Sequence, residues 1–166
     1  MFADVPAVRH ITFQAWLGAY GTFIPEEDMR AYLEQHFLAP TLERVMSSPD
    51  VHGYVAEDSS GPIGWMRTLW DPTARRCSMT SLYVLPDRQG CGAGGRLLEV
   101  AERCALSHGV SELWVGVLEQ NLPALSWYEK RGFVRMHDAP FTMGKTTLSH
   151  CLCVKQLVPK GLHHGS

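Results

Sequence analysis

The fold is decided by residues 84–95, which read Val84-Leu85-Pro86-Asp87-Arg88-Gln89-Gly90-Cys91-Gly92-Ala93-Gly94-Gly95. Residues 76–85 predict a strand that Pro86 ends, and the residues after the loop carry apolar side chains at helical spacing as far as Gly109. Glycines leave the backbone amides of such a loop unobstructed, and the positive end of a helix dipole attracts anions. The stretch therefore predicts a strand–loop–helix unit that can bind phosphate groups.

The loop by itself also admits other interpretations. A glycine-rich connector without a ligand explains the same composition. Residues 90–95 match the G-x-G-x-x-G dinucleotide fingerprint, with Glu112 or Glu119 as its distant acid. That match is disfavoured because residues 86–89 separate the strand from the first glycine. A P-loop is disfavoured because the Gly-Lys-Ser/Thr ending is absent.

The rest of the chain surrounds this unit with further helices and strands. Before the loop, helices are expected at 3–20 and 25–46, and strands at 52–57, 63–69 and 76–85. After the loop helix, a strand is expected at 113–118, a helix at 121–130, and strands at 133–135 and 149–157 around an irregular segment at 138–147. The order predicts an α/β domain with a mixed, mostly antiparallel sheet, because only the unit at 76–118 requires a parallel crossover.

Composition excludes several classes of protein. The 166 residues carry 15 Lys+Arg and 17 Asp+Glu, a net charge of −2, so no basic excess points to nucleic acid. No run of apolar residues is long enough to span a membrane, and no signal peptide is recognised. Five cysteines, an odd number, indicate reduced thiols and a cytoplasmic location. We assign residues 1–158 to one domain and residues 159–166 to a flexible tail.

Two segments resemble signatures of the GCN5-related N-acetyltransferase (GNAT) family. Residues 84–94 are similar to its acetyl-CoA loop, Gln/Arg-x-x-Gly-x-Gly/Ala, with Gln89, Gly92 and Gly94 at the defining positions. Residues 121–133 are similar to its second signature, an Asn-x-x-Ala followed by Tyr-Glu-Lys-x-Gly-Phe. Residues 12–33 resemble, more weakly, the PaiA-type polyamine acetyltransferases. Family members usually have a strand before the start of their first helix, but here Ala3 and Asp4, which resemble that helix start, follow Met1 almost directly. The family's first edge strand is therefore expected to be missing or short.

The resemblance implies acetyl-CoA as co-substrate and no metal. Backbone amides of three strand residues would pair with the pantetheine arm, and these are Leu82, Tyr83 and Val84. Amides of the loop would hold the pyrophosphate, and its residues are Gln89, Gly90, Cys91, Gly92, Ala93, Gly94 and Gly95. Asn121 would bond the pantetheine or brace the loop, and Lys130 would approach the nucleotide. Cys91, in a loop that can lower a thiol pKa, is also a candidate for reversible oxidation.

Two groups are expected to handle protons. Tyr128 lies where the resembling family places a tyrosine that protonates the departing CoA thiolate. An alkylammonium must lose a proton before it attacks a thioester, so a base is needed. Residues 77–80 contain no carboxylate. Glu119 is the first candidate base, and Glu26, Glu27 or a water relay are alternatives.

The acceptor site is expected near the start of the second helix, at Phe23, Glu26 and Glu27. An acidic rim there would attract a cationic amine, although an ordinary helix with an acidic first turn explains the same residues. Cys151 and Cys153, beside His150, lie too close in sequence for the usual zinc spacing, so no metal is expected.

The sequence thus predicts an N-acetyltransferase that moves an acetyl group to a primary amine of a small molecule, such as a polyamine, or of a peptide. A non-catalytic acyl-CoA-binding module and a nucleotide-binding oxidoreductase domain are the alternatives. A missing edge strand would leave sheet hydrogen bonds for a partner, which is compatible with a homodimer.

Overall fold

The computed structural model describes residues 4–158, and the expected tail at 159–166 lies outside them. Five α-helices are present in this range: α1 (Val5–Tyr20), α2 (Glu26–His36), α3 (Ala39–Met46), α4 (Ala93–Ser107) and α5 (Leu122–Glu129). Six strands form one sheet: β1 (Val51–Asp58), β2 (Gly61–Asp71), β3 (Arg76–Val84), β4 (Glu112–Leu118), β5 (Val134–Met143) and β6 (Thr146–Gln156).

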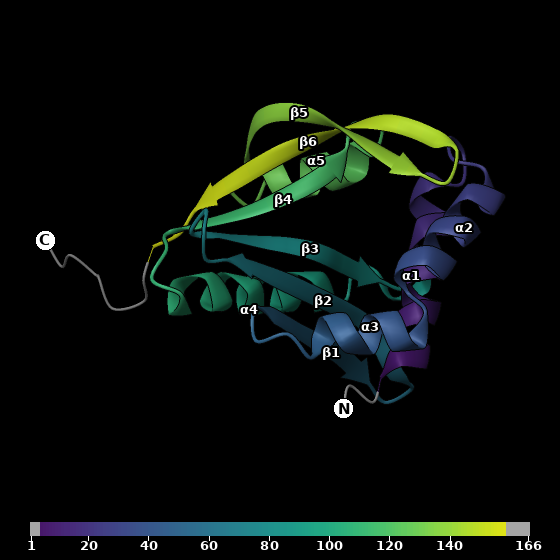
Figure 1. Ribbon diagram of the computed structural model, residues 1–166, viewed down its shortest axis with the longest axis horizontal. Coiled ribbons are helices and arrows are strands. Elements are labelled where there is room, and N and C mark those ends of the chain that lie inside the picture. The colour runs from purple at the N-terminus through teal and green to yellow at the C-terminus, as the bar shows by residue number, and fades with distance from the viewer. Residues whose placement is uncertain (1–3, 159–166) are drawn as a thin grey trace, which may run out of the picture.

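The sheet is mixed and is divided near its middle. Its strand order is β1-β2-β3-β4-β6-β5, and all neighbours are antiparallel except β3 and β4. These two parallel strands pair only at Ser78 with Trp114 and at Met79 with Val115. Figure 1 shows β3 and β4 diverging beyond this point, with α1 and α2 near the open end. The backbone groups of β3 after Met79 therefore have no partner on β4.

The helix expected over residues 25–46 is two helices in the structure. α2 ends at His36, and Phe37 and Leu38 connect it to α3, whose second residue is Pro40. Proline lacks the N–H that a helix interior needs, and its ring clashes with the preceding turn. Pro40 is tolerated in the first turn of a new helix, so the chain bends before it.

The segment expected to be irregular, residues 138–147, is a β-hairpin formed by β5 and β6 around Gly144 and Lys145. Pro140 lies in β5, which is an edge strand and so tolerates a residue that cannot donate to the ladder. The Asp28 carboxylate of α2 accepts hydrogen bonds from the Lys145 backbone N–H (2.9 Å) and the Thr146 hydroxyl (2.6 Å). α2 thereby anchors the hairpin tip.

Asp28→Asn should make this anchor visible in the pH dependence of stability. The Lys145 N–H and then the Thr146 hydroxyl lower the pKa of Asp28 below its ordinary value of 3.8. A lowered pKa means that the folded state favours the carboxylate, so its contribution is present at pH 7 and is lost as the pH falls below about 4 through the folded pKa. The Tm of the variant should be lower at pH 7, and the difference should shrink toward pH 3. An equal difference at both pH values would contradict the assignment.

Two hydrophobic cores lie on the sheet. One packs α4 and α5 against it around Met66, Leu97 and Leu113, and the other packs α1–α3 around Trp16, Trp65 and Leu42. In the second core the fully buried Trp65 indole N–H donates to the Thr12 hydroxyl at 2.9 Å, and that hydroxyl donates to the Val8 carbonyl oxygen. This polar chain fixes α1 on β2.

Thr12→Val should lower the free energy of unfolding by about 1–3 kcal/mol, because the isosteric side chain leaves the buried Trp65 N–H without an acceptor. Urea unfolding measures the change. If the bond is the cause, Thr12→Val should have a smaller effect in a Trp65→Phe background. Equal losses in the two backgrounds would assign the effect to packing instead.

Candidate active site

The glycine loop forms an amide-lined turn at the N-terminus of α4. Gly90 and Gly92 have φ values of +87° and +89°, a region that residues with a Cβ rarely adopt. Gly92 is the residue before the first turn of α4, and space around both glycines is open. The Gln89 side chain donates to the Val84 carbonyl oxygen at 3.4 Å and ties the loop to the end of β3. The local geometry suits an anion at the helix end.

A cleft of about 940 Å³ extends from this loop, between α1 and α5, to the divergence of β3 and β4. Most residues predicted to bind acetyl-CoA line it: Leu82, Tyr83, Val84, Gln89, Gly90, Gly92, Ala93, Gly94, Gly95 and Asn121. Phe23, predicted for the acceptor, also lines this cleft. Cys91 is exposed and does not line it, nor does Lys130. We call this space the donor cleft.

Two cations of the donor cleft were not predicted from sequence. Arg131 lies 3.7 Å above the Trp127 ring and donates to the Trp127 carbonyl oxygen at 3.1 Å. Arg88 also lines the cleft and forms an ion pair with Asp58 at 3.2 Å. Arg131, rather than the neighbouring Lys130, lines the cleft, and the i,i+4 spacing from Trp127 is the sequence signal that could have identified it.

Tyr128, on α5, lines the donor cleft. Its ring packs edge-on against Trp127 and Phe133, and only 8% of the residue is exposed. Burial, together with the neighbouring Tyr83 hydroxyl, raises the pKa of Tyr128. The phenol is therefore protonated at neutral pH. Asn121 caps α5 by accepting a hydrogen bond from the Ala124 N–H at 3.4 Å, which helps to fix the helix that carries Tyr128.

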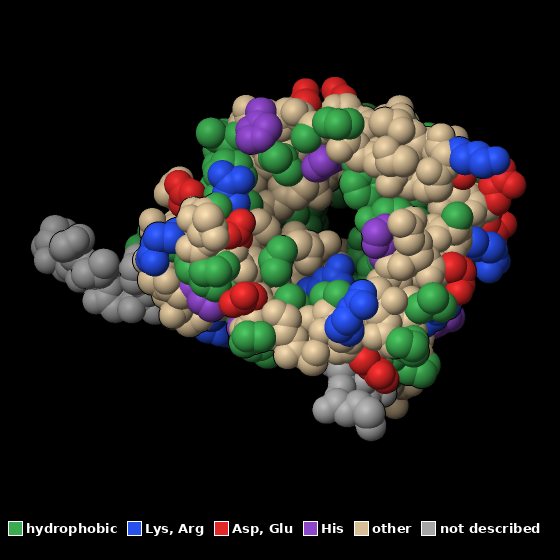
Figure 2. Space-filling model, viewed as in Figure 1, with side chains coloured by type: hydrophobic (Ala, Val, Ile, Leu, Met, Phe, Trp, Pro, Cys, Tyr) green, Lys and Arg blue, Asp and Glu red, His purple; other side chains and the backbone are tan. Residues whose placement is uncertain are grey.

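A second cavity of about 640 Å³ meets the donor cleft where β3 and β4 diverge. The two spaces share seven lining residues: Tyr20, Met79, Thr80, Ser81, Tyr83, Val115 and Gly116. Residues of α2, α3, β2, β5 and β6 also line the second cavity. Figure 2 shows the hollow in the middle of this face, with Lys or Arg side chains below it and histidines beside it. We call this space the acceptor cavity.

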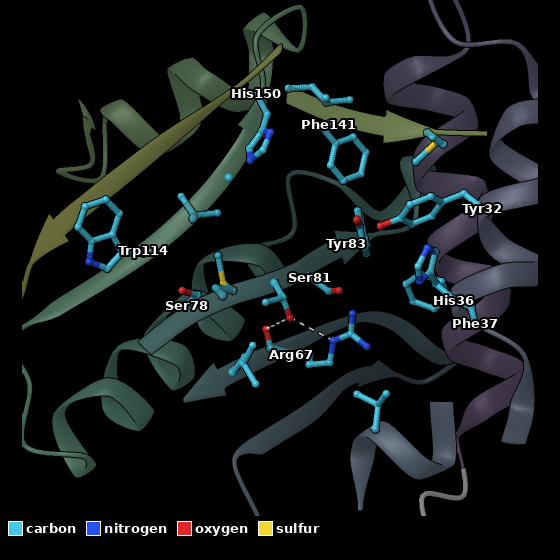
Figure 3. A pocket seen from close by; sticks show the side chains of 18 of the residues that line it. Tyr32, His36, Phe37, Arg67, Ser78, Ser81, Tyr83, Trp114, Phe141 and His150 are labelled. Atoms are coloured by element: carbon cyan, nitrogen blue, oxygen red, sulfur yellow. Dashed lines mark hydrogen bonds between the residues drawn. The ribbon is translucent and has the colours of Figure 1, made fainter. Parts of the chain in front are cut away.

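Arg67 lies on the floor of the acceptor cavity (Figure 3). Its Nε donates to the Thr80 hydroxyl at 3.1 Å, and its guanidinium carbon lies 5.5 Å from the centres of the Phe37 and Trp65 rings. No carboxylate of the described residues lies within 4.0 Å of it. Burial lowers the pKa of Arg67, but a guanidinium remains charged in proteins.

His150 enters the acceptor cavity from β6 and faces Arg67 across it (Figure 3). A Cβ on Gly116 would lie only 2.8 Å from the His150 Cδ2, so the glycine makes room for the imidazole beside the diverging strands. Burial lowers the pKa of His150 below its ordinary value of 6.5, so the ring is neutral at pH 7 and can accept a proton. A hydrogen bond with the backbone of Ala139, which pairs with His150 across β5 and β6, opposes this shift.

The carboxylates proposed from sequence lie elsewhere. Glu26 is exposed and pairs with Arg30 at 2.9 Å, and neither Glu26 nor Glu27 lines either cavity. Glu119 is exposed beyond the end of β4, where its backbone N–H donates to the Ser149 carbonyl oxygen. Across the residues that the structure describes, no aspartate or glutamate lines the donor cleft or the acceptor cavity.

The remaining cysteine and histidine clusters show no sign of a site. Cys151 and Cys153 are buried in the core, and burial raises the pKa of Cys151 to about 11. Residues 4–158 contain no group of three or more His, Cys, Asp or Glu side chains placed to hold a metal ion. Within the same range, every helix is too short or too polar to cross a membrane.

Comparison with known proteins agrees with this geometry. The model of the acetyltransferase (GNAT) family matches residues 10–133. The chain therefore belongs to the GNAT family of acetyltransferases and is an acyltransferase of the N-acetyltransferase type. It is 25% identical over 161 residues to an uncharacterized N-acetyltransferase in the pepI 3' region of Lactobacillus delbrueckii subsp. lactis, with 93% of each chain covered.

Two further similarities agree. The uncharacterized N-acetyltransferase YuaI of Bacillus subtilis (strain 168) is 28% identical over 150 residues, which cover 87% of this chain and 83% of YuaI. The crystal structure of the PaiA N-acetyltransferase from Thermoplasma acidophilum, in complex with coenzyme A, has a TM-score of 0.78 to this chain at 21% identity, with 92% of each chain covered. This likeness confirms the fold predicted from the sequence, including its mixed sheet.

Proposed function

We propose that the protein transfers the acetyl group of acetyl-CoA directly to a primary amine. The observation that carries this proposal is the junction of the two spaces. The donor cleft begins at an amide-lined helix N-terminus and meets the acceptor cavity where β3 and β4 diverge. A thioester and an amine can meet there without a covalent enzyme intermediate.

Several features of the donor cleft suit parts of coenzyme A. The amides of the glycine loop suit the pyrophosphate, and Arg131, which pairs with no carboxylate of the described residues, can supply positive charge to the nucleotide. The backbone of β3 after Met79 is unpaired on its β4 side, so the pantetheine arm can add to it like a strand. An amide of residues 82–84 can also stabilise the oxyanion that forms at the thioester carbonyl.

Two side chains on opposite sides of the junction handle the protons. The ammonium first gives one proton to solvent, and the neutral amine nitrogen then attacks the thioester carbon. The second proton, which the nitrogen loses as the amide forms, passes to the neutral His150. We assign the base to His150 rather than to Glu119, because His150 lines the acceptor cavity. When the C–S bond breaks, the CoA sulfur takes the phenolic proton of Tyr128. The products are an N-acetylated amine and free CoA, and exchange of protons with solvent returns His150 to the neutral ring and Tyr128 to the phenol.

The alternative is a module that binds acyl-CoA without catalysis. Stabilisation by acetyl-CoA in a thermal unfolding assay is expected from both functions. Release of free CoA thiol in the presence of a panel of primary amines, followed with a thiol reagent, is expected from the enzyme alone. Binding without amine-dependent thiol release from any amine in the panel would favour the module.

Location and assembly are also proposals. All five cysteines are free thiols in the structure, which supports a cytoplasmic location. β1 is an edge strand and carries the exposed Tyr54, and such an edge can pair with a second copy of the chain. Light scattering on the purified protein measures whether a homodimer forms.

A further inference from the structure

The charge of the acceptor cavity is unlike that of the molecule. The chain carries a net charge of −2, yet three arginines line this cavity, Arg44, Arg67 and Arg76, and none of its lining residues is acidic. None of the three pairs with a carboxylate of the described residues. Such a wall repels a polycation and attracts an anion.

Arg67 is positioned to bind an oxyanion rather than merely to add charge. The Arg67 Nε donates its hydrogen bond to the Thr80 hydroxyl, and the Phe37 and Trp65 rings flank the guanidinium. Its two terminal nitrogens have no hydrogen-bond partner among residues 4–158. A guanidinium held in one orientation, with its terminal donors free, matches the two oxygens of a carboxylate or phosphonate.

A further polar atom of the same wall also lacks a partner. The buried Ser81 Oγ has no hydrogen-bond partner among the described residues. Ser81 lines the acceptor cavity. Ser81 is only 5% exposed and lies opposite Arg67 in the pairing of β2 with β3. Because buried polar groups are normally paired, this wall suits a polar ligand better than an aliphatic one.

We propose that the acceptor is a small molecule that carries an acidic group as well as its primary amine, as an amino acid does, and that Arg67 binds this acidic group. The inference rests on the proposed acetyltransferase function and names its substrate class. The amine lies toward His150 and the thioester, and the oxyanion lies toward Arg67 on the opposite side of the cavity. This assignment differs from the polyamine suggested by residues 12–33, because the acidic side chains of α2 do not reach the cavity.

Matched acceptors test the proposal. L-amino acids should be compared with the corresponding amino-acid amides, 2-aminoethylphosphonate with ethanolamine, and both sets with spermidine, by CoA thiol release. Acceptors with an acidic group should have a kcat/KM about 10-fold or more above their neutral partners, as expected for a charge-assisted hydrogen bond. The comparison with the amides is strict, because the amine of an amino-acid amide loses its proton more easily than that of the amino acid. Without a preference for the acidic group, the amide would therefore react faster.

Variants at Arg67 locate the effect. Arg67→Met should reduce kcat/KM for acidic acceptors by about 10–100-fold and leave neutral acceptors nearly unchanged. Arg67→Lys should retain part of the preference, since it keeps the charge and loses the paired donors. Arg30→Met is the matched control, because Arg30 is exposed on α2 outside both spaces. Thermal unfolding with and without CoA reports whether each variant is folded and binds its donor.

The outcomes separate this proposal from the proposed function. Faster acetylation of amides or spermidine than of acidic acceptors would overturn the substrate class while leaving the acetyltransferase intact. An acid preference that survives in folded Arg67→Met would overturn the role of Arg67. Acetyl-CoA binding without transfer to any amine would overturn both proposals together. The wild-type panel alone decides the substrate class if neither Arg67 variant folds.

Discussion

Tyr128→Phe should lower kcat by about 10²–10⁴-fold with little change in the affinity for acetyl-CoA, the usual range for loss of a general acid. The variant removes one oxygen from a buried ring that packs on Trp127 and Phe133, so the fold of α5 should persist. The CoA thiolate would then leave without a proton donor. Steady-state turnover at saturating substrates measures the effect.

Tyr54→Phe is the control for this experiment. Tyr54 lies on the edge strand β1, outside both the donor cleft and the acceptor cavity, and loses the same atom. Its turnover should equal that of the wild type. Unchanged kcat in Tyr128→Phe would show that the thiolate is protonated by another group, and Tyr128 would then have only a packing role.

His150→Gln should reduce kcat at pH 7 by about 10²–10⁴-fold, because the amide cannot accept the proton of the attacking amine. The pH profile gives a second readout. Burial lowers the pKa of His150 from 6.5, so the neutral base is present at pH 7 and is lost only as the pH falls below that value. The wild-type kcat should therefore fall on the acid side of 6.5, and this decline should be absent from the residual activity of the variant.

His10→Gln is the matched control, since His10 is exposed on α1 and lines neither space. Its profile should follow that of the wild type. If the acid decline of kcat persists in His150→Gln, a different group, or a water relay, is the base. If kcat at pH 7 is reduced in His150→Gln and its residual activity shows no decline at acid pH, His150 is the group that takes the proton.

The lining of the donor cleft could largely be predicted, because many of its residues are close in sequence. The glycine loop and the segment beginning at Asn121 each form a local turn before a helix, and local turns leave recognisable spacings. The strand–loop–helix order also determines one parallel crossover, from which the mixed sheet follows. What the spacing did not show was where side chains such as Cys91 and Lys130 point once the turn is made.

The acceptor half was not predictable in the same way. Arg67 and His150 belong to strands that are far apart in sequence and meet only through the strand order of the sheet. No spacing connects them, and His150 drew attention only as a neighbour of Cys151 and Cys153. The acidic first turn of α2 suggested a cationic acceptor, but its side chains face solvent or, in Asp28, the hairpin tip.

The junction of the donor cleft and the acceptor cavity has a consequence for the order of events in one catalytic cycle. One space is lined by the glycine loop and α5, and the other by residues of α2, α3 and the β5–β6 hairpin. Acetyl-CoA therefore does not have to pass through the acceptor cavity, and the amine does not have to pass through the donor cleft. Donor and acceptor can therefore bind in either order, and initial rates should give intersecting double-reciprocal lines. Each product can also depart through its own opening, so free CoA should compete with acetyl-CoA but not with the amine.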